Sequence, residues 1–144
     1  MITFDFRDGN GPVPAHQHPN GGGWVADSAH VAATAFIGKT AWVYGDAWVY
    51  GNARVHGNAR VSGDAQVYGN ARVKRGKFHQ TPTSITRSDG YTFTLQSDGS
   101  IIAGCRDFTE KEARKYWGNP KHHKHHESIA IVNALYAISE AREK

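Results

Sequence analysis

The sequence predicts a mainly β protein in which a short parallel β-helix of hexapeptide repeats is followed by a small α+β module. A branched aliphatic residue recurs every six positions from Val25 to Val73, and alanine recurs at a fixed offset from it between Ala29 and Ala71. The period then ends, and signals for one hairpin and two helices follow. A fixed period shared by so many units indicates a repeat architecture.

Residues 1–24 are expected to form a strand followed by an irregular loop. Ile2–Phe6 alternates apolar and polar residues, and the stretch from Gly9 to Gly23 is rich in glycine, proline and histidine. His16 and His18 are metal-ligating residue types, but a pair two positions apart supplies too few ligands for a site.

Residues 25–76 are expected to form the β-helix, because no α-helical period fits a strict repeat of six. Each unit would be a short strand followed by a corner. The corners from Gly45-Asp46 to Gly69-Asn70 pair glycine with Asp or Asn, which tolerate tight left-handed backbone. The bulky valines and small alanines would fill a narrow interior. The first three repeats lack the glycine pair.

These repeats resemble the bacterial transferase hexapeptide family, whose pattern is an aliphatic residue, a variable one, Gly, Asp or Asn, a small residue and a variable one. The resemblance covers about a third of the chain. It implies a left-handed parallel β-helix with three hexapeptides per coil, and a homotrimer. Because this fold serves enzymes and non-enzymes alike, the resemblance assigns no activity.

Three hexapeptides per coil place residues eighteen apart in one column, which sorts the outward side chains onto three sides. We expect an aromatic side with His30, Trp48, Tyr50, Gln66 and Tyr68, a basic side with Phe36, Arg54, His56, Arg72 and Lys74, and a mixed side with Trp42, Tyr44 and Arg60. A monomer rarely exposes so many aromatic residues together. We therefore expect the C-terminal module or a neighbouring subunit to cover them.

Residues 77–144 are expected to form a ββαα module. Tyr91–Leu95 and Ser100–Ala103 are predicted strands of a hairpin. Thr109 is a predicted helix N-cap with Glu112 completing a capping box, and that helix should end near Gly118. A second helix is predicted over residues 128–141.

The C-terminal segment resembles a module of uncharacterised phage and prophage proteins that carry hexapeptide repeats. The resemblance lies in Asp89-Gly90-Tyr91-Thr92-Phe93, Ala103-Gly104-Cys105-Arg106, Glu112-Ala113-Arg114 and Trp117. It implies a viral accessory setting and carries no activity.

Two local features were weighed as chemical sites. Cys105 stands beside Arg106, which would lower a thiol pKa, but no pattern supplies a histidine base, so a small buried cysteine is expected. The histidine-rich run could capture zinc or nickel, but a solvated loop or an oligomer contact is the preferred interpretation; its residues are His122, His123, His125 and His126.

Composition limits the class of protein. Apolar residues make up 39% of the chain, and the longest apolar run is far too short to span a bilayer. The net charge of +4 is spread evenly, which argues against nucleic acid as a partner. A single cysteine is typical of a reducing cytoplasm, which would be that of the host if the protein is viral. No cofactor is indicated.

Three functions remain open from the sequence. The first is a non-catalytic trimer that captures a small anionic, nucleotide-like ligand between subunits, as a sponge for a host defence signal would. The second is a CoA-dependent acyltransferase with His56 or His30 as its base. The third is a structural protein or one that binds a host protein. The predicted ligand-binding residues are Trp42, Tyr44, Trp48, Tyr50, Arg54, His56, Arg60, Tyr68, Arg72 and Arg106.

Overall fold

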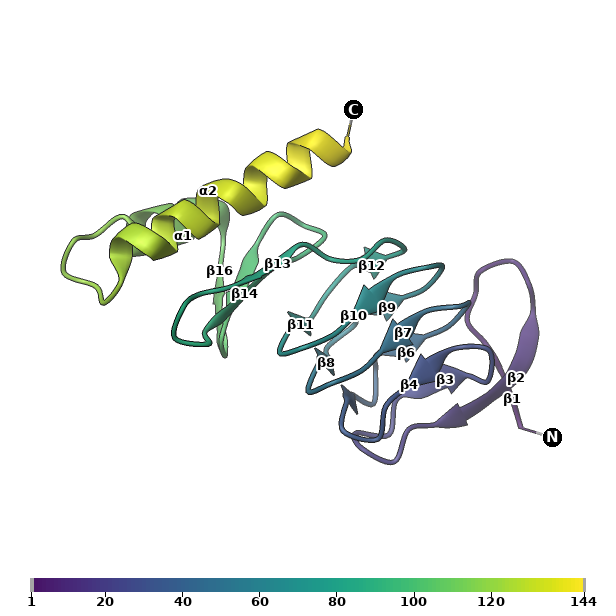
Figure 1. The fold of residues 1–144 in the computed structure, drawn as a ribbon. Helices are drawn as coiled ribbons and strands as arrows, with labels where there is room; N and C mark the ends of the chain where they lie inside the picture. Colours follow the sequence, from purple (N-terminus) through teal and green to yellow (C-terminus); the bar gives the residue numbers. More distant parts are fainter. Residues whose placement is uncertain (1, 144) are drawn as a thin grey trace. The chain divides into compact units, whose positions relative to one another are not determined.

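The computed structural model describes residues 2–143 and divides the chain into two compact units between Pro82 and Thr83. The first unit contains the repeats and the N-terminal segment (Figure 1). The second contains an antiparallel sheet and two helices. This is the mainly β class that the sequence predicts.

The repeats form a β-solenoid of about three turns, and nearly every hexapeptide contributes one very short strand. The strands are β3 (Trp24–Ala26), β4 (His30–Val31), β5 (Phe36–Ile37), β6 (Trp42–Val43), β7 (Trp48–Val49), β8 (Arg54–Val55), β9 (Arg60–Val61), β10 (Gln66–Val67), β11 (Arg72–Val73) and β12 (Lys77–Phe78).

Parallel pairing between successive turns stacks these strands into three sheets. One sheet has the order β4-β7-β10, a second has β5-β8-β11, and a third continues through β3-β6-β9-β12. Residues eighteen apart pair throughout, as in Trp48 with Gln66, except in the last turn, where Lys77 pairs with Arg60. The last turn is therefore one residue shorter, and the coil continues to Phe78.

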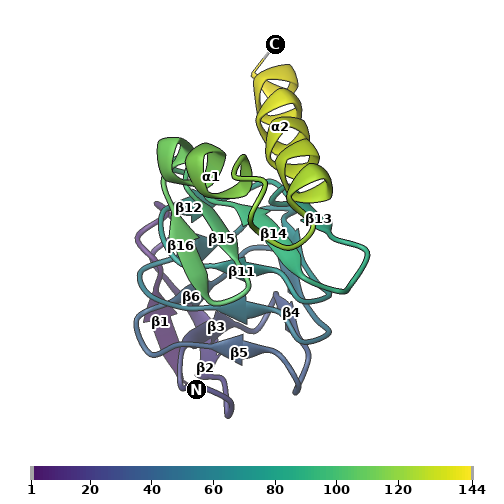
Figure 2. The same cartoon turned by 90° about the vertical axis from the view of Figure 1, so that its left-hand side faces the viewer.

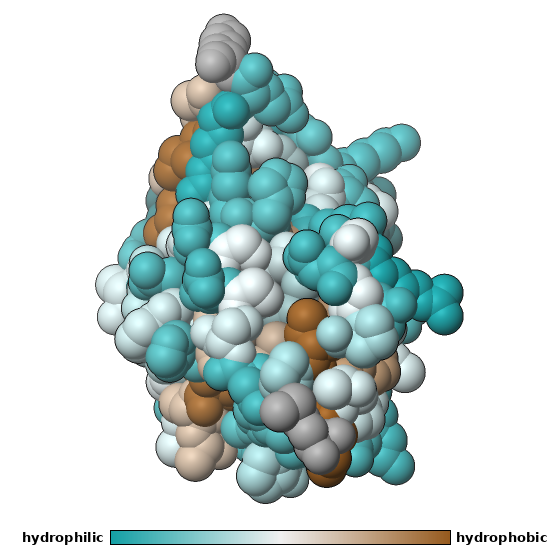
Figure 3. Space-filling view, turned by 90° about the vertical axis from the view of Figure 1, so that its right-hand side faces the viewer, coloured by the Kyte–Doolittle hydropathy of each residue, from teal (hydrophilic) through white to brown (hydrophobic). Residues whose placement is uncertain are grey.

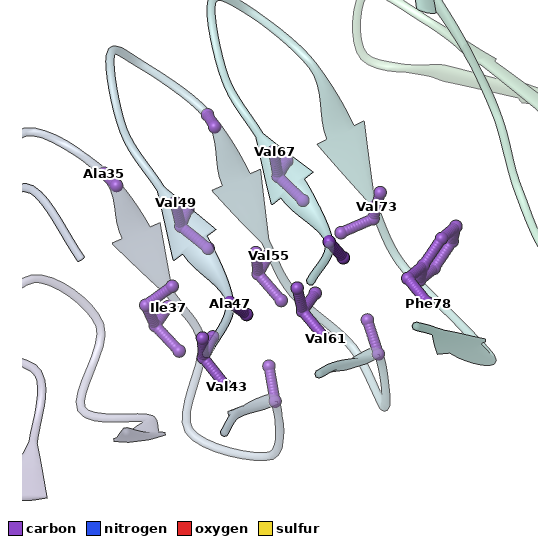
Figure 4. Close-up of a cluster of buried hydrophobic side chains, with 14 of the residues drawn as sticks. Ala35, Ile37, Val43, Ala47, Val49, Val55, Val61, Val67, Val73 and Phe78 are labelled. Atoms are coloured by element: carbon purple, nitrogen blue, oxygen red, sulfur yellow. The ribbon is translucent and has the colours of Figure 1, made fainter. Parts of the chain in front are cut away.

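The interior of the coil is one continuous core of valine, isoleucine and alanine side chains, with Phe78 in the last turn (Figure 4). Val43, Val55 and Val61 are fully buried, as are the alanines between them. The predicted glycine corners adopt the expected left-handed backbone, for example φ 67° at Gly45. The large and small inward residues thus fill a narrow core without polar groups.

Hydroxyl side chains replace the glycine corners in the first turn. Ser28, Thr34 and Thr40 each donate a hydrogen bond to the backbone carbonyl oxygen seventeen residues ahead, at Gly45, Gly51 and Gly57, with distances of 2.5–2.6 Å. These bonds join the corners of the first turn to those of the second. The departures from the repeat pattern therefore have a structural role in linking turns.

An N-terminal hairpin extends the third sheet, which corrects the predicted irregular loop. Strand β1 (Thr3–Asp5) pairs antiparallel with β2 (Pro12–Gln17), and β2 pairs with β3. Pro12 and Pro14 are two positions apart, so both missing N–H groups lie on one edge of β2. Pairing with β3 begins only at Ala15, just after the second proline, so a proline-containing strand is tolerated.

The second unit has four strands rather than the two predicted, followed by the two predicted helices (Figure 2). The sheet order is β13-β14-β15-β16, and all neighbours are antiparallel. The elements are β13 (Ser84–Thr86), β14 (Thr92–Leu95), β15 (Ile101–Ala103), β16 (Arg106–Phe108), α1 (Glu110–Trp117) and α2 (His125–Arg142). The outer strands are short and polar, which hid them from a search for apolar alternation.

Specific polar contacts fix the helices of this unit. Thr109 caps α1, and the capping box with Glu112 is formed as predicted. Helix α2 begins at His125, three residues before the predicted start. Its first turn is tied to the sheet by Arg87, whose guanidinium binds both Asp89 and the Ser128 hydroxyl.

Candidate functional site

The register of the coil decides which outward side chains share a side. Trp48 pairs with both His30 and Gln66, Phe36 and Arg72 both pair with Arg54, and Trp42 pairs with Arg60. The predicted sorting onto three sides therefore holds, and it divides the predicted ligand-binding residues among separate surfaces.

The first side carries an exposed row of rings, which we call the aromatic strip. It consists of His30, Trp48, Tyr50 and Tyr68. The His30 ring lies 4.3 Å from that of Trp48, and the Tyr50 and Tyr68 rings stack 5.4 Å apart at 13°. Trp48 is 47% exposed and Tyr68 is 50% exposed. The strip is thus an exposed aromatic surface carried by the sheet β4-β7-β10.

The second side carries a cationic strip formed by Arg54, Arg72 and Lys74. Arg54 and Arg72 are register partners on adjacent strands, and the Arg54 guanidinium carbon lies 5.2 Å from the Phe36 ring centroid. His56 is half-buried on the same side, with Gly38 against its Cα. Like charges on neighbouring strands repel one another, so this arrangement favours an anionic partner.

On the third side the N-terminal hairpin covers the predicted aromatic residues. Phe4 stacks on Trp24 at 4.7 Å and meets the Trp42 ring edge-on at 5.1 Å. Phe6, which is buried, stacks on Tyr44 at 5.0 Å. The expectation that only the C-terminal module or another subunit would cover these rings is therefore wrong for this side.

Arg60 is held against the coil rather than extended into solvent. Its guanidinium carbon lies 3.8 Å from the Trp42 ring centroid, and Nη1 donates to the carbonyl oxygens of Thr40 at 2.8 Å and Asn58 at 3.0 Å. Burial lowers the pKa of Arg60 from its usual value. The side chain is fixed in position, and a guanidinium remains positively charged at neutral pH.

Arg106 belongs to the second unit, where it begins strand β16. Its guanidinium donates to the Tyr116 hydroxyl at 2.9 Å and lies over the same ring at 4.8 Å. Nearby Cys105 is exposed in the turn between β15 and β16. The prediction of a buried cysteine is therefore wrong, because the tight turn at Gly104 directs the next residue outward.

The histidines have individual roles. His122 stacks on Tyr116 at 3.7 Å, the rings of His125 and His126 lie 3.8 Å apart at a tilt of 40° in the first turn of α2, and His123 is exposed. His16 binds the Asp27 carboxylate at 2.7 Å, whereas buried His18 binds the Ala35 carbonyl oxygen. Among residues 2–143, no three His, Cys, Asp or Glu side chains are grouped so that they could hold a metal ion.

Comparison with known protein families gives one match. A family model described as the YdcK beta solenoid repeat matches residues 41–57 and 65–76. The coil is similar to that repeat. Both matched segments lie within the second and third turns, where the glycine corners are regular. The match therefore supports the β-solenoid fold and goes no further. Comparisons with the curated proteins and with solved structures give no match.

Several residues around these surfaces were missed by sequence reasoning. These residues belong to the third side: Trp24, Phe4, Phe6, Arg7 and Lys77. The alternation in Ile2–Phe6 was the one available signal, since it placed both phenylalanines on the same side of a strand.

In the part of the chain described, no helix is long and apolar enough to cross a membrane.

Proposed function

We propose that this chain is a non-catalytic binding protein that assembles as a homotrimer and captures a small anionic, nucleotide-like ligand between subunits. The observation that carries the proposal is the aromatic strip, with Trp48 and Tyr68 about half exposed on one sheet of the coil. Base–aromatic stacking is worth about 1–3 kcal/mol per base. Rings that are already aligned can supply it without an ordering cost.

Threefold assembly would bring two different sides of the coil together. Contacts in a cyclic trimer are heterologous, so one side of each subunit meets another side of the next. The aromatic strip of one subunit and the cationic strip of its neighbour would then line one cleft. The rings would stack on a base, and the guanidinium groups of Arg54 and Arg72 would bind phosphate oxygens in a forked geometry.

The size of the strip favours a small molecule over a polymer. It spans the three strands β4, β7 and β10, which at about 4.8 Å between strands is roughly 10 Å. That length suits one nucleotide or dinucleotide. A binder without turnover lowers the free concentration of its ligand, and in a virus-infected cell this would blunt a nucleotide defence signal.

The direct test combines native mass spectrometry with calorimetric titration of a panel of nucleotides and cyclic nucleotides. We expect a trimer, one ligand per cleft, and a Kd weakened about 10–100-fold by Tyr68→Ala, the loss of one stacking contact. Lys111→Gln, an exposed cation on α1, is the matched control and should leave Kd unchanged. Absence of heat with every nucleotide would contradict the proposal.

The same purified protein can be used to test the two alternative functions, acyltransferase and protein binding. Turnover of acetyl-CoA that disappears in His56→Ala would indicate the acyltransferase instead. A stoichiometric host protein recovered with the wild-type chain, and lost in Trp48→Ala, would indicate a protein-binding role.

A further inference from the structure

A hollow on the third side of the coil has a lining of rings and cations. Its volume is about 420 Å³, and we call it the hairpin hollow; its lining residues are Phe6, Arg7, Trp42, Tyr44, Arg60 and Lys77. Three of these six residues carry positive charge, and none is acidic. Figure 3 shows the side of the molecule on which β1 and β2 lie, where brown apolar patches are set among teal hydrophilic residues.

Two of the cations are brought together by the coil itself. Arg60 and Lys77 are register partners on the adjacent strands β9 and β12, so their side chains leave the sheet on the same side. Arg60 is fixed by the Trp42 ring and by backbone carbonyl oxygens. Two cations on facing positions of a strand pair raise the positive potential on this side of the sheet, which attracts an anion.

The third cation, Arg7, occupies a costly backbone conformation. Its φ is 58°, and its N–H donates to the Asp5 carboxylate at 2.8 Å. A left-handed conformation costs a residue with a Cβ about 1–2 kcal/mol, and glycine would avoid that cost. The next residue, Asp8, binds Asn10 and does not line the hollow. Strain of this kind is concentrated at functional sites, and here it places an arginine at the rim of a cationic hollow.

We infer that the hairpin hollow binds a phosphate-bearing small molecule, with Arg7, Arg60 and Lys77 neutralising the phosphate. The rings contribute apolar walls rather than a stacking platform, because Phe6 is already stacked on Tyr44 and Arg60 lies over Trp42. The volume lies within the range typical of small-molecule sites. All six residues come from one chain, so this site does not depend on the proposed trimer or on the aromatic strip.

Calorimetric titration of the full chain with pyrophosphate and with ribose 5-phosphate, two phosphates that carry no base to stack on the aromatic strip, tests the inference. We expect one site per chain, and a Kd at least tenfold weaker in Lys77→Gln and in Arg7→Gly. Arg7→Gly should also melt at the same temperature as the wild type or higher, because glycine relieves the backbone strain. A merely structural role for Arg7 would lower the melting temperature, which would count against the inference.

Arg54→Gln separates this site from the proposed function. It lies on the cationic strip, outside the hollow, and should leave pyrophosphate and ribose 5-phosphate binding within twofold of the wild type. Equal loss of binding in Arg54→Gln would place the anion on the cationic strip and overturn the inference. So would a wild-type chain that binds neither probe, or Lys77→Gln and Arg7→Gly chains that bind both probes as tightly as the wild type.

Discussion

Two glycines of the repeat provide a matched test of how tightly successive turns are stacked. Gly57 and Gly69 occupy equivalent corner positions and have nearly the same φ, 57° and 62°. A Cβ added at Gly57 would lie well inside van der Waals contact of the Lys74 carbonyl oxygen in the next turn. A Cβ added at Gly69 would meet nothing within 4 Å. The two positions therefore share the conformational cost of substitution and differ in the steric cost.

The magnitudes follow from these two terms. Alanine in the left-handed region costs about 1–2 kcal/mol, which should be the whole effect of Gly69→Ala. Gly57→Ala adds a backbone shift of the overpacking kind, about 1–3 kcal/mol more. The backbone of the next turn must supply that shift, because the atom in contact is a carbonyl oxygen and not the end of a flexible side chain. We therefore expect a destabilisation of about 2–5 kcal/mol for Gly57→Ala.

Urea unfolding followed by far-UV circular dichroism measures both variants. The midpoint should fall in both, about twice as far or more in Gly57→Ala, with the slope unchanged. Gly69→Asn is a useful control, since asparagine tolerates the left-handed region and should recover part of the loss at Gly69. Equal midpoints for Gly57→Ala and Gly69→Ala would refute the reasoning, because they would mean that the contact with Lys74 costs nothing.

Three further predictions concern the hairpin and the second unit. Phe6→Ala should cost about 3–5 kcal/mol, because the ring is buried, and a red shift in tryptophan fluorescence would report the uncovering of Trp42. The hydrogen bonds from Arg87 hold the pKa of Asp89 below its usual value, so the unfolded state binds the proton more readily. Stability should then fall as the pH drops below about 4, and Asp89→Asn should flatten that part of the urea-midpoint profile. Burial raises the pKa of Tyr136 to about 12, so the phenol ionises first in the unfolded state; stability should fall as the pH rises above about 10, and Tyr136→Phe should remove that loss.

The coil could be predicted because each of its requirements is repeated. The same type of inward residue recurs every six positions. The prediction that Val43 and Val55 are buried therefore did not depend on any single residue. The assignment of the outward side chains to three sides followed from counting in steps of eighteen residues. That count fails only in the last turn, where the step from Val73 to Phe78 is five residues instead of six.

The hairpin could not be predicted because its energy comes from contacts distant in sequence. Phe4 packs on Trp24 and Trp42, which lie twenty and thirty-eight residues further along the chain. Locally the hairpin, residues 3–17, has two prolines and two glycines, and both residue types disfavour strands. Only the pairing with β3 and the aromatic contacts make a strand of Pro12–Gln17 favourable.

The outer strands of the second unit were missed for a different reason. Strand β13 is joined to β14 by hydroxyl pairs, Thr86 with Thr92 at 3.0 Å and Ser84 with Thr94 at 3.3 Å, and β16 has two charged residues among its three. Such pairs support a sheet without apolar alternation. A pattern search for alternating hydrophobic residues therefore finds the two central strands and leaves out their neighbours.

Trp42 and Trp48 show what a repeat determines and what it leaves open. They occupy the same position in consecutive hexapeptides, so the coil directs both side chains outward by the same geometry. Trp42 is then covered by Phe4 and Phe6, whereas Trp48 stays 47% exposed beside His30. The repeat determines the direction in which each side chain points. The hairpin, which does not repeat, determines what surrounds the side chains on the third side only. The same segment brings Arg7 to the rim of the hollow that Arg60 and Lys77 line. Binding at the hairpin hollow should therefore depend on residues outside the repeat, and a chain without residues 1–23 should lose the hollow while it keeps the aromatic strip.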